Sequence, residues 1–156
     1  MNAFLWMMDL PAGYWLAAAL LGLGVGLWTR RWVPALLAVW AFYVFSLAVL
    51  SRSTQPEAQV MLRLFWSYEN WPEGWEQIVA NVAVFVPLGF LLGLLTGWKG
   101  VFAGAGFSLL IELLQLLLRR GVFEFDDILH NTLGTLLGVA LAVLLLRLRH
   151  RATGDS

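Results

Sequence analysis

VFAGAGFSLLIELLQLLL, residues 101–118, is the stretch that decides the class of fold. Glu112 is its only charged residue, and a helix of about 18 residues can cross the roughly 30 Å hydrocarbon core of a bilayer. Further apolar segments of similar length lie at residues 12–28, 33–50, 78–96 and 128–146. Open strands would leave backbone groups unsatisfied in lipid, so all these segments are predicted to be helices. The sequence therefore predicts an all-α integral membrane bundle of about five transmembrane helices, forming a single domain over the whole chain.

The composition also favours a membrane protein, because 60% of the 156 residues are hydrophobic and 13% are charged. Soluble domains have about 45–50% apolar and about 25% charged residues. The chain has no cysteine, which excludes disulfides and thiolate metal sites, and its two histidines are too few for a histidine-based metal cluster. A net charge of zero gives no indication of a nucleic-acid partner. We therefore expect no metal, no cofactor and no nucleic acid.

The connection over residues 51–77 is long but not plainly polar. Apolar side chains recur within it at helical spacing, at Val60, Met61, Leu64, Phe65 and Tyr68. This spacing favours an amphipathic helix that lies on the membrane surface. A tethered loop is the alternative.

The basic residues predict the orientation of the chain in the membrane. If the predicted helices pass up and down, six basic residues fall on one side: Arg30, Arg31, Lys99, Arg147, Arg149 and Arg151. Four fall on the other side: Arg52, Arg63, Arg119 and Arg120. The side with more basic residues is expected to be cytoplasmic, which places the N-terminus outside the cell and the C-terminus inside.

Glu112 is a carboxylate within a predicted membrane helix. It shares one helix face with Gln115 and Arg119, at i, i+3 and i+7. A lone carboxylate at mid-bilayer costs about 2.5–3.5 kcal/mol. We therefore expect Glu112 to have a cationic partner (Arg119 or Arg120), a hydrogen-bonded neutral form, or contact with water.

The last predicted helix has a matching face, with Asp127, Asn131, Gly134 and Gly138 spaced i, i+4, i+7 and i+11. Asp126 and Asp127 stand where this helix begins, and the positive end of the helix dipole favours negative charge there. Gly134 and Gly138 form a Gly-x-x-x-Gly pair that allows a neighbouring helix to approach closely.

The predicted helix over residues 78–96 adds Asn81 near its start, and Pro87 and Gly89 further in indicate a kink or a close helix contact. With the helices threaded up and down, the polar residues of three of them fall toward the same membrane side: Asn81, Glu112, Gln115, Arg119, Arg120, Asp126, Asp127 and Asn131. We interpret these eight residues as one ligand-binding pocket, because ionisable groups inside a membrane indicate function. Interhelical hydrogen bonds and an ion pair that only locks the helices are the alternative.

Several of these stretches resemble a known family. NVAVFVPLGF at residues 81–90 is similar to the family's Asn-x-x-x-Phe-x-Pro-x-Gly-Phe segment. SLLIELLQ at 108–115, the arginine pair at 119–120 and DDILHNTLGTLLG at 126–138 resemble the hallmark block of VanZ-like proteins. The resemblance is strongest over residues 51–146.

A looser part of the resemblance lies in the long connection, where Arg52 and LFWSY at 64–68 are similar to an arginine and a Pro-Phe motif of the family. The resemblance implies a multi-pass protein of the bacterial plasma (inner) membrane. The namesake of the family is associated with resistance to the glycopeptide teicoplanin, so antibiotic resistance is a role that the resemblance implies.

The leading functional hypothesis is a protein that binds or handles an envelope lipid, a lipid-linked envelope precursor or a lipoglycopeptide in a pocket toward the outer leaflet. Arg119 or Arg120 would donate paired hydrogen bonds to a phosphate or carboxylate of that ligand. The alternatives are a membrane enzyme acting on a lipid-linked phosphate or ester, a proton-linked lipid transporter, and a structural scaffold. The sequence has no evident arrangement of an activated nucleophile, which disfavours the enzyme and leaves its catalytic residues unknown. The ligand and the oligomeric state are left open, and a homo-oligomer fits the sequence.

Overall fold

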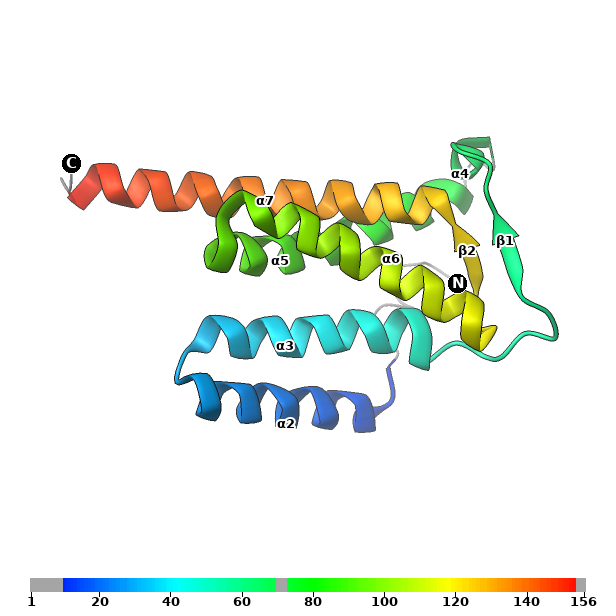
Figure 1. Ribbon diagram of the computed structural model, residues 1–156, viewed down its shortest axis with the longest axis horizontal. Helices are drawn as coiled ribbons and strands as arrows, with labels where there is room; N and C mark the ends of the chain where they lie inside the picture. Colours follow the sequence, from blue (N-terminus) through cyan, green and yellow to red (C-terminus); the bar gives the residue numbers. More distant parts are fainter. Residues whose placement is uncertain (1–9, 70–72, 154–156) are drawn as a thin grey trace.

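The computed structural model describes residues 10–69 and 73–153. Long helices account for most of these residues: α2 (Ala12–Thr29), α3 (Trp32–Phe45), α5 (Glu73–Thr96), α6 (Gly100–Leu118) and α7 (Phe125–Thr153). The helices run roughly side by side along the longest axis of the molecule (Figure 1). The predicted all-α class is therefore confirmed.

The described residues contain four helical stretches that are long and apolar enough to cross a membrane. One of them, Gly74–Leu118, has 45 residues and includes both α5 and α6. It folds back on itself at the short 3-10 helix η2 (Gly97–Lys99), so α5 and α6 run in opposite directions (Figure 1). Gly97 adopts a φ of 59°, which glycine tolerates without steric cost and which allows this reversal.

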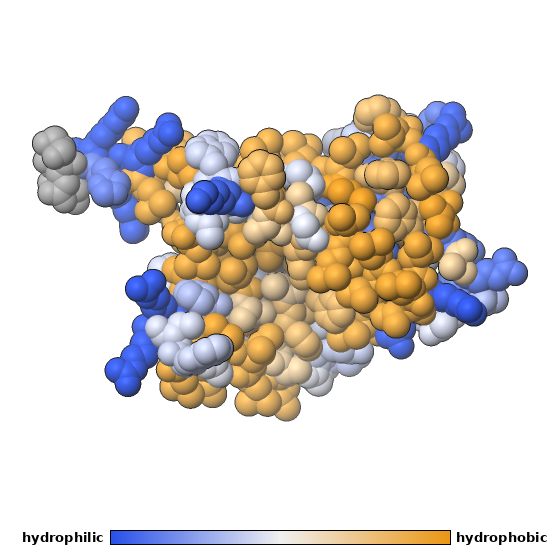
Figure 2. All heavy atoms as spheres, viewed as in Figure 1, coloured by the Kyte–Doolittle hydropathy of each residue, from blue (hydrophilic) through white to orange (hydrophobic). Residues whose placement is uncertain are grey.

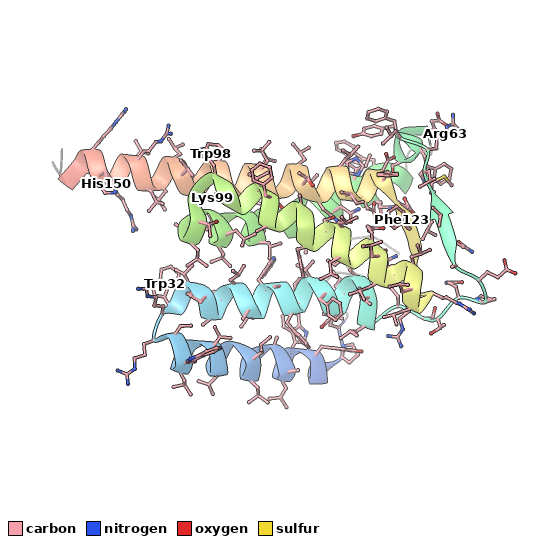
Figure 3. All side chains as sticks on the ribbon, in the orientation of Figure 1. Trp32, Arg63, Trp98, Lys99, Phe123 and His150 are labelled. Carbon is pink, nitrogen blue, oxygen red and sulfur yellow. The ribbon has the colours of Figure 1, made fainter. Side chains whose placement is uncertain are left out.

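The surface has an apolar middle and polar ends. Hydrophobic side chains cover the centre of the visible face, and hydrophilic ones gather toward the two ends of the long axis (Figure 2). Lys99 and His150 lie toward one end, and Arg63 lies toward the other (Figure 3). This arrangement is typical of a protein whose helices cross a bilayer and whose charged groups remain at its two surfaces.

Among the helices that the structure describes, α5 and α7 share the most extensive contact. A methyl group built on Gly134 would collide with the backbone carbonyl oxygen of Val82, and one built on Gly138 would collide with that of Val86. In the same way, Gly89 lies directly against the backbone of Thr135. The glycines therefore allow the two backbones to meet, as small residues do in membrane interfaces. Close packing at this seam fixes where α7 presents its polar first turns to α5.

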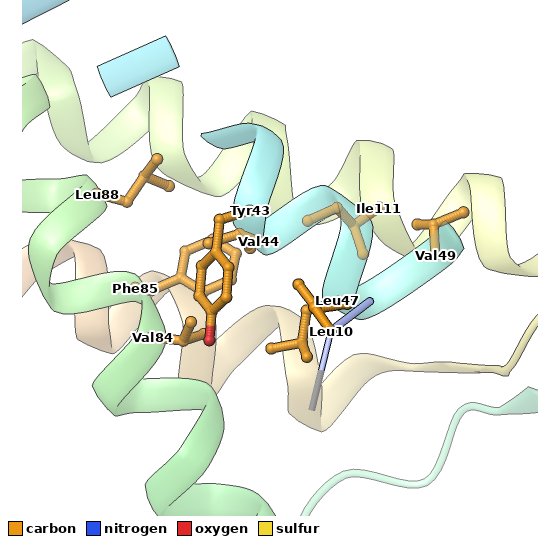
Figure 4. Packing of buried hydrophobic residues seen from close by; sticks show 9 residues of the cluster. All are labelled: Leu10, Tyr43, Val44, Leu47, Val49, Val84, Phe85, Leu88 and Ile111. Carbon is orange, nitrogen blue, oxygen red and sulfur yellow. The ribbon is translucent and has the colours of Figure 1, made fainter. Parts of the chain in front are cut away.

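A buried apolar cluster joins α3 to the rest of the bundle. Val44 of α3, Phe85 of α5 and Ile111 of α6 are each 2% exposed and lie close together (Figure 4). The ring nitrogen of Trp40 on α3 also donates a hydrogen bond to the carbonyl of Val84, at 2.9 Å. Packing therefore places the end of α3 beside the polar ends of α5, α6 and α7.

The connection between α3 and α5 differs from the predicted amphipathic helix. Val60 and Met61 lie in strand β1 (Gln59–Met61), which pairs in parallel with β2 (Val122–Glu124) of the connection between α6 and α7. A four-residue helix, α4 (Trp66–Glu69), follows, and residues 70–72 lie outside the described part of the chain. The helical spacing at residues 60–68 thus does not produce one continuous helix.

Backbone hydrogen bonding explains this difference. The Gln55 N–H donates to the carbonyl of Arg119 at 2.6 Å, and β1 then finds its backbone partners on β2. Buried or half-buried backbone groups need such partners, and over a few residues apolar spacing does not distinguish a helix from a strand. Val60, Leu64 and Phe65 remain at least 50% exposed, so the placement of this segment on the membrane surface stays a prediction.

Candidate functional site

A small cavity lies where α3 ends and where α5, α6 and α7 bring their polar residues together. Its volume is about 40 Å³, which is enough for a few water molecules or one small polar group. One part of its lining is apolar and includes Val44, Val84, Phe85 and Ile111. The polar part consists of Arg52, Asn81, Glu112, Gln115, Asp127 and Asn131. We call this space the carboxylate cavity, because Glu112 and Asp127 both line it.

Asp127 is held by two amides of α5. Its Oδ1 atom accepts a hydrogen bond from Asn81 Nδ2 at 2.6 Å and another from Gln77 Nε2 at 3.1 Å. Gln77 and Asn81 are four residues apart, so both lie on the face of α5 that meets the start of α7. Asp127 is 6% exposed, and the N-terminus of α7 adds a favourable dipole.

Glu112 reaches from α6 to the connection that follows it. Its Oε2 atom accepts a hydrogen bond from the backbone N–H of Glu124 at 2.9 Å, and its side chain is 1% exposed. Arg52 is the cation that interacts electrostatically with Glu112, with Glu124 and with Asp127. Three carboxyl groups therefore lie within electrostatic reach of one guanidinium at this end of the bundle.

Glu124 belongs to β2, outside the apolar helices, and titrates far from its ordinary range. Burial, followed by the nearby Asp127 carboxylate, raises the pKa of Glu124 to about 7. The Arg52 charge and a hydrogen bond from Gln77 oppose this rise without cancelling it. Glu124 can therefore gain or lose a proton near neutral pH.

The buried amides on the deeper side of the cavity connect α7 and α3 to α6. Asn131 Nδ2 donates to the hydroxyl of Ser108 at 2.9 Å, and Gln115 Nε2 donates to the carbonyl of Ala48, also at 2.9 Å. Ala48 lies in η1 (Ser46–Leu50), a π-helical turn that continues α3. The Gln115 Oε1 and Asn131 Oδ1 atoms are buried without a hydrogen-bond partner in the described protein. Such acceptors are expected to take a hydrogen bond from water or from a ligand.

Asp126 faces away from the cavity and ties down the long connection. Its two carboxylate oxygens accept hydrogen bonds from the backbone N–H groups of Phe65 at 2.7 Å and Ser67 at 3.0 Å. Nearby, the Tyr68 hydroxyl and His130 Nε2 lie 3.1 Å apart. Asp126 thus supplies the hydrogen bonds that the first residues of α4 need, which is the role of a helix cap. In the described ranges, no group of three His, Cys, Asp or Glu side chains could hold a metal ion.

Arg119 and Arg120, the predicted partners of Glu112, are placed elsewhere. Arg119 ends α6 in a left-handed conformation and its Nη1 donates to the carbonyl of Pro56 at 3.3 Å. Arg120 Nη1 donates to the carbonyl of Leu50 at 3.1 Å. Arg119 has the i+7 spacing from Glu112, but the helix ends at Leu118 and the guanidinium turns toward the loop. Arg52, and not the predicted Arg119 or Arg120, supplies the positive charge that acts on Glu112.

Of the eight predicted pocket residues, five line the carboxylate cavity: Asn81, Glu112, Gln115, Asp127 and Asn131. Three further residues belong to the site but were not among the predicted pocket residues: Arg52, Gln77 and Glu124. Gln77 could have been found, because it lies one turn before Asn81 on the same helix face. Glu124 follows a turn, and no periodicity indicates where its side chain points.

Comparison with known proteins gives the family of the chain. No curated protein and no solved structure matched it. The model of the family described as VanZ/LLP1 matches residues 32–146, which extend from α3 almost to the end of α7. The match includes every residue of the carboxylate cavity and leaves α2 outside. The chain that builds this cavity is therefore a member of the VanZ/LLP1 family.

Proposed function

We propose that this protein binds an amphiphile of the bacterial cell envelope, a lipid or a lipopeptide, at the external side of the plasma membrane. One small polar group of the ligand, such as a hydroxyl or an amide, would enter the carboxylate cavity. Its hydrocarbon chains would remain in the surrounding bilayer. The ligand class includes lipid-linked envelope precursors and lipoglycopeptides.

The observation that carries this proposal is the convergence of polar side chains from three helices and one loop on a cavity with an apolar wall. The buried Gln115 Oε1 and Asn131 Oδ1 atoms are acceptors that a ligand donor would satisfy. Val84 and Phe85 in the apolar part of the lining would exclude competing water. Concave sites with a mainly apolar lining and a few convergent polar groups are typical ligand sites.

The placement in the membrane is part of the proposal. We propose five membrane passes, with α5 and α6 counted separately, an external N-terminus and a cytoplasmic C-terminus. Lys99 and His150 lie toward the same end of the molecule, away from Arg63 (Figure 3). The excess of basic residues at the first end supports its assignment to the cytoplasm, so the cavity would open toward the outer surface.

Native mass spectrometry of the detergent-purified full chain tests this function. Wild-type protein expressed in a bacterial host is expected to retain an envelope amphiphile, whose mass gives its class. Glu112→Gln removes a titratable carboxyl from the cavity at nearly constant shape, and Ala80→Val adds volume at a buried residue that lines it. Both variants are expected to lose at least about 90% of the retained ligand, since a tenfold loss of affinity corresponds to about 1.4 kcal/mol.

Arg119→Ala is the matched control, because this exposed arginine does not line the cavity and its guanidinium donates to the loop carbonyl of Pro56. It should retain the ligand as the wild type does. Equal retention by the wild type and by both cavity variants, with all proteins monodisperse, would contradict the proposal. That result would favour a scaffold whose polar residues only lock the helices.

Resistance to teicoplanin is a separate part of the proposal, which follows from the family. Expression of the chain in a susceptible bacterium is expected to raise the minimal inhibitory concentration of teicoplanin, and Glu112→Gln should remove that increase at equal membrane abundance. An unchanged susceptibility would limit the function to lipid binding.

A further inference from the structure

A second and larger pocket lies on the other side of Arg52. It has a volume of about 420 Å³, which falls within the range of small-molecule sites. Loop residues 51–59 and the turn after α6 form its walls. Its polar lining consists of Arg52, Arg120, Ser51, Ser53, Gln55 and Gln59. We call it the arginine pocket.

The charges of the two pockets differ sharply. The arginine pocket has two guanidinium groups and no carboxylate in its lining, whereas the carboxylate cavity has two carboxyl groups and shares Arg52. Two like charges around one pocket attract a counter-ion. Hydroxyl and amide groups beside them can donate further hydrogen bonds to an oxyanion.

The position of Arg120 leaves it able to bind a ligand. It is half-buried, and its Nη1 donates to the carbonyl of Leu50 at 3.1 Å. A guanidinium has five N–H donors, so this bond fixes the side chain and leaves other donors for the pocket. Arginine matches the geometry of phosphate and carboxylate oxygens, to which it can donate two parallel hydrogen bonds.

Gly121 lies beside Arg52, the residue that lines both pockets. It lines the arginine pocket, and a methyl group built on it would lie 3.0 Å from Arg52 Nη1 and 3.2 Å from Gln115 Cδ. The absence of a side chain at this residue leaves room for the guanidinium of Arg52 close to the backbone. A ligand with an anionic group and a neighbouring polar group could therefore contact both sides of one guanidinium.

We propose that the arginine pocket is a binding site for a phosphate-type oxyanion, held by Arg52 and Arg120. The anion is either free phosphate or the phosphate headgroup of the amphiphile. This inference rests on the proposed function only for the second source. The headgroup would then occupy the larger pocket, and only a small adjacent polar group would enter the carboxylate cavity.

Two binding measurements on the purified full chain in neutral detergent test the inference and separate the two sources. In the first, calorimetry follows titration with sodium phosphate at constant ionic strength, with chloride as the control anion. In the second, native mass spectrometry counts phosphatidylglycerol retained from mixed micelles with phosphatidylethanolamine. Saturable binding of phosphate alone identifies a free anion as the ligand. Preferential retention of phosphatidylglycerol identifies a lipid headgroup.

The variants of the arginine pair give the decisive comparison. Arg120→Gln is expected to weaken binding of the probe that the wild type takes up by at least about tenfold, as loss of a charged hydrogen-bond partner does. Arg120→Lys should recover part of it, and Arg119→Gln should stay within about twofold of the wild type because Arg119 does not line the pocket. Equal binding by Arg120→Gln and the wild type, or no saturable binding of either probe by the wild type, would overturn the inference.

The same measurements distinguish failure of the inference from failure of the proposed function. Ala80→Val and Glu112→Gln change residues that line the carboxylate cavity and do not line the arginine pocket. If they leave lipid retention unchanged while Arg120→Gln abolishes phosphate binding, the amphiphile proposal fails and the anion site stands. If they release lipid while Arg120→Gln has no effect on either probe, the anion site fails alone.

Discussion

Helix α2 and the seam between α5 and α7 both contain apolar helices, but they differ in how much of each helix is buried inside the protein. Only 11% of the α2 stretch Ala12–Thr29 is buried inside the protein, compared with 39% of an 18-residue window within Phe125–Ala152 of α7. On α2, Leu20, Leu23 and Leu27 are each at least 59% exposed. In α7, buried glycines and polar groups lie against α5.

The difference shows that apolarity and packing are separate demands in a membrane. Lipid accepts the exposed leucines of α2, so that helix needs little more than length and hydrophobicity. The seam between α5 and α7 gains its stability from close backbone contact and from satisfied polar groups. The family match begins at residue 32 and thus covers the seam and excludes α2.

The largest difference in stability between α2 and the α5–α7 seam is expected when a glycine in each is replaced by alanine. Gly138→Ala places a methyl group against the backbone of Val86 and Phe90, which cannot yield as a flexible side chain would. We expect a loss of about 3 kcal/mol or more, seen as a large drop in the melting midpoint of the detergent-purified protein. The control is Gly24→Ala on α2, where nothing lies within 4 Å of the added methyl group.

Gly24→Ala should be neutral or slightly stabilising, because alanine favours a helix by up to about 1 kcal/mol over glycine. Equal melting midpoints for Gly24→Ala and Gly138→Ala would show that the seam is not tightly packed, and the contrast between the two regions would fail.

Removal of a polar group should also destabilise the α5–α7 seam more than it destabilises α2. Asp127→Ala leaves the Asn81 and Gln77 amides without their common acceptor. Loss of such a buried partner should cost about 3 kcal/mol. Thr29→Ala on α2 removes an exposed hydroxyl that donates to the carbonyl of Val25, and should cost less than about 0.5 kcal/mol. Unfolding in a denaturing detergent titration compares the two, and similar midpoints would contradict a structural role for Asp127.

The helices could be predicted from the sequence because the bilayer demands long apolar runs. The predicted segment 12–28 agrees closely with α2, and the predicted segment 78–96 ends with α5, which begins five residues earlier at Glu73. The long connection could not be predicted in the same way. Its strand β1 forms because β2 offers it backbone partners, and the pairing of Gln59 with Val122 joins residues more than sixty positions apart. No local sequence pattern contains that information.

The polar site could be predicted only as far as helix periodicity reaches. Spacing brought together Glu112 and Gln115 on α6, and Asp127 and Asn131 on α7, and all four line the cavity. Their cation was misassigned because Arg119 lies past the last turn of α6, where periodicity no longer gives the direction of a side chain. Arg52 lies in a loop, and its position depends on tertiary contacts.

The stability of the end of the bundle that holds the carboxylate cavity should depend on pH. Helix α2 should not contribute to this dependence, because it has no acidic or basic residue. The pKa of Glu124 rises from its ordinary value of 4.5 to about 7, so the folded protein retains a proton that the unfolded chain releases. The contribution of Glu124 to the free energy of unfolding has its full value below about pH 4.5 and falls as the pH rises to about 7. The loss should be on the order of 2 kcal/mol, measured as a fall in the melting midpoint between pH 5 and pH 8.

Glu124→Gln is the matched variant for this prediction, because it resembles the protonated carboxyl and does not titrate. Its melting midpoint should fall less than that of the wild type over the same pH range. Parallel pH profiles for the two proteins would assign the dependence to other groups.

The smallest effect is expected at the exposed ion pair of the same polar end. Arg63 Nη2 and Glu69 Oε1 lie 2.7 Å apart, but their side chains are 65% and 53% exposed. Water and salt screen such a pair, so Arg63→Ala should change stability by less than about 0.5 kcal/mol. The same denaturing detergent titration checks this value beside Asp127→Ala. A loss as large as that of Asp127→Ala would mean that location at the polar end, and not burial, determines the cost of removing a charge. The small expected loss instead makes burial the property that distinguishes the carboxylate cavity from the surface around it.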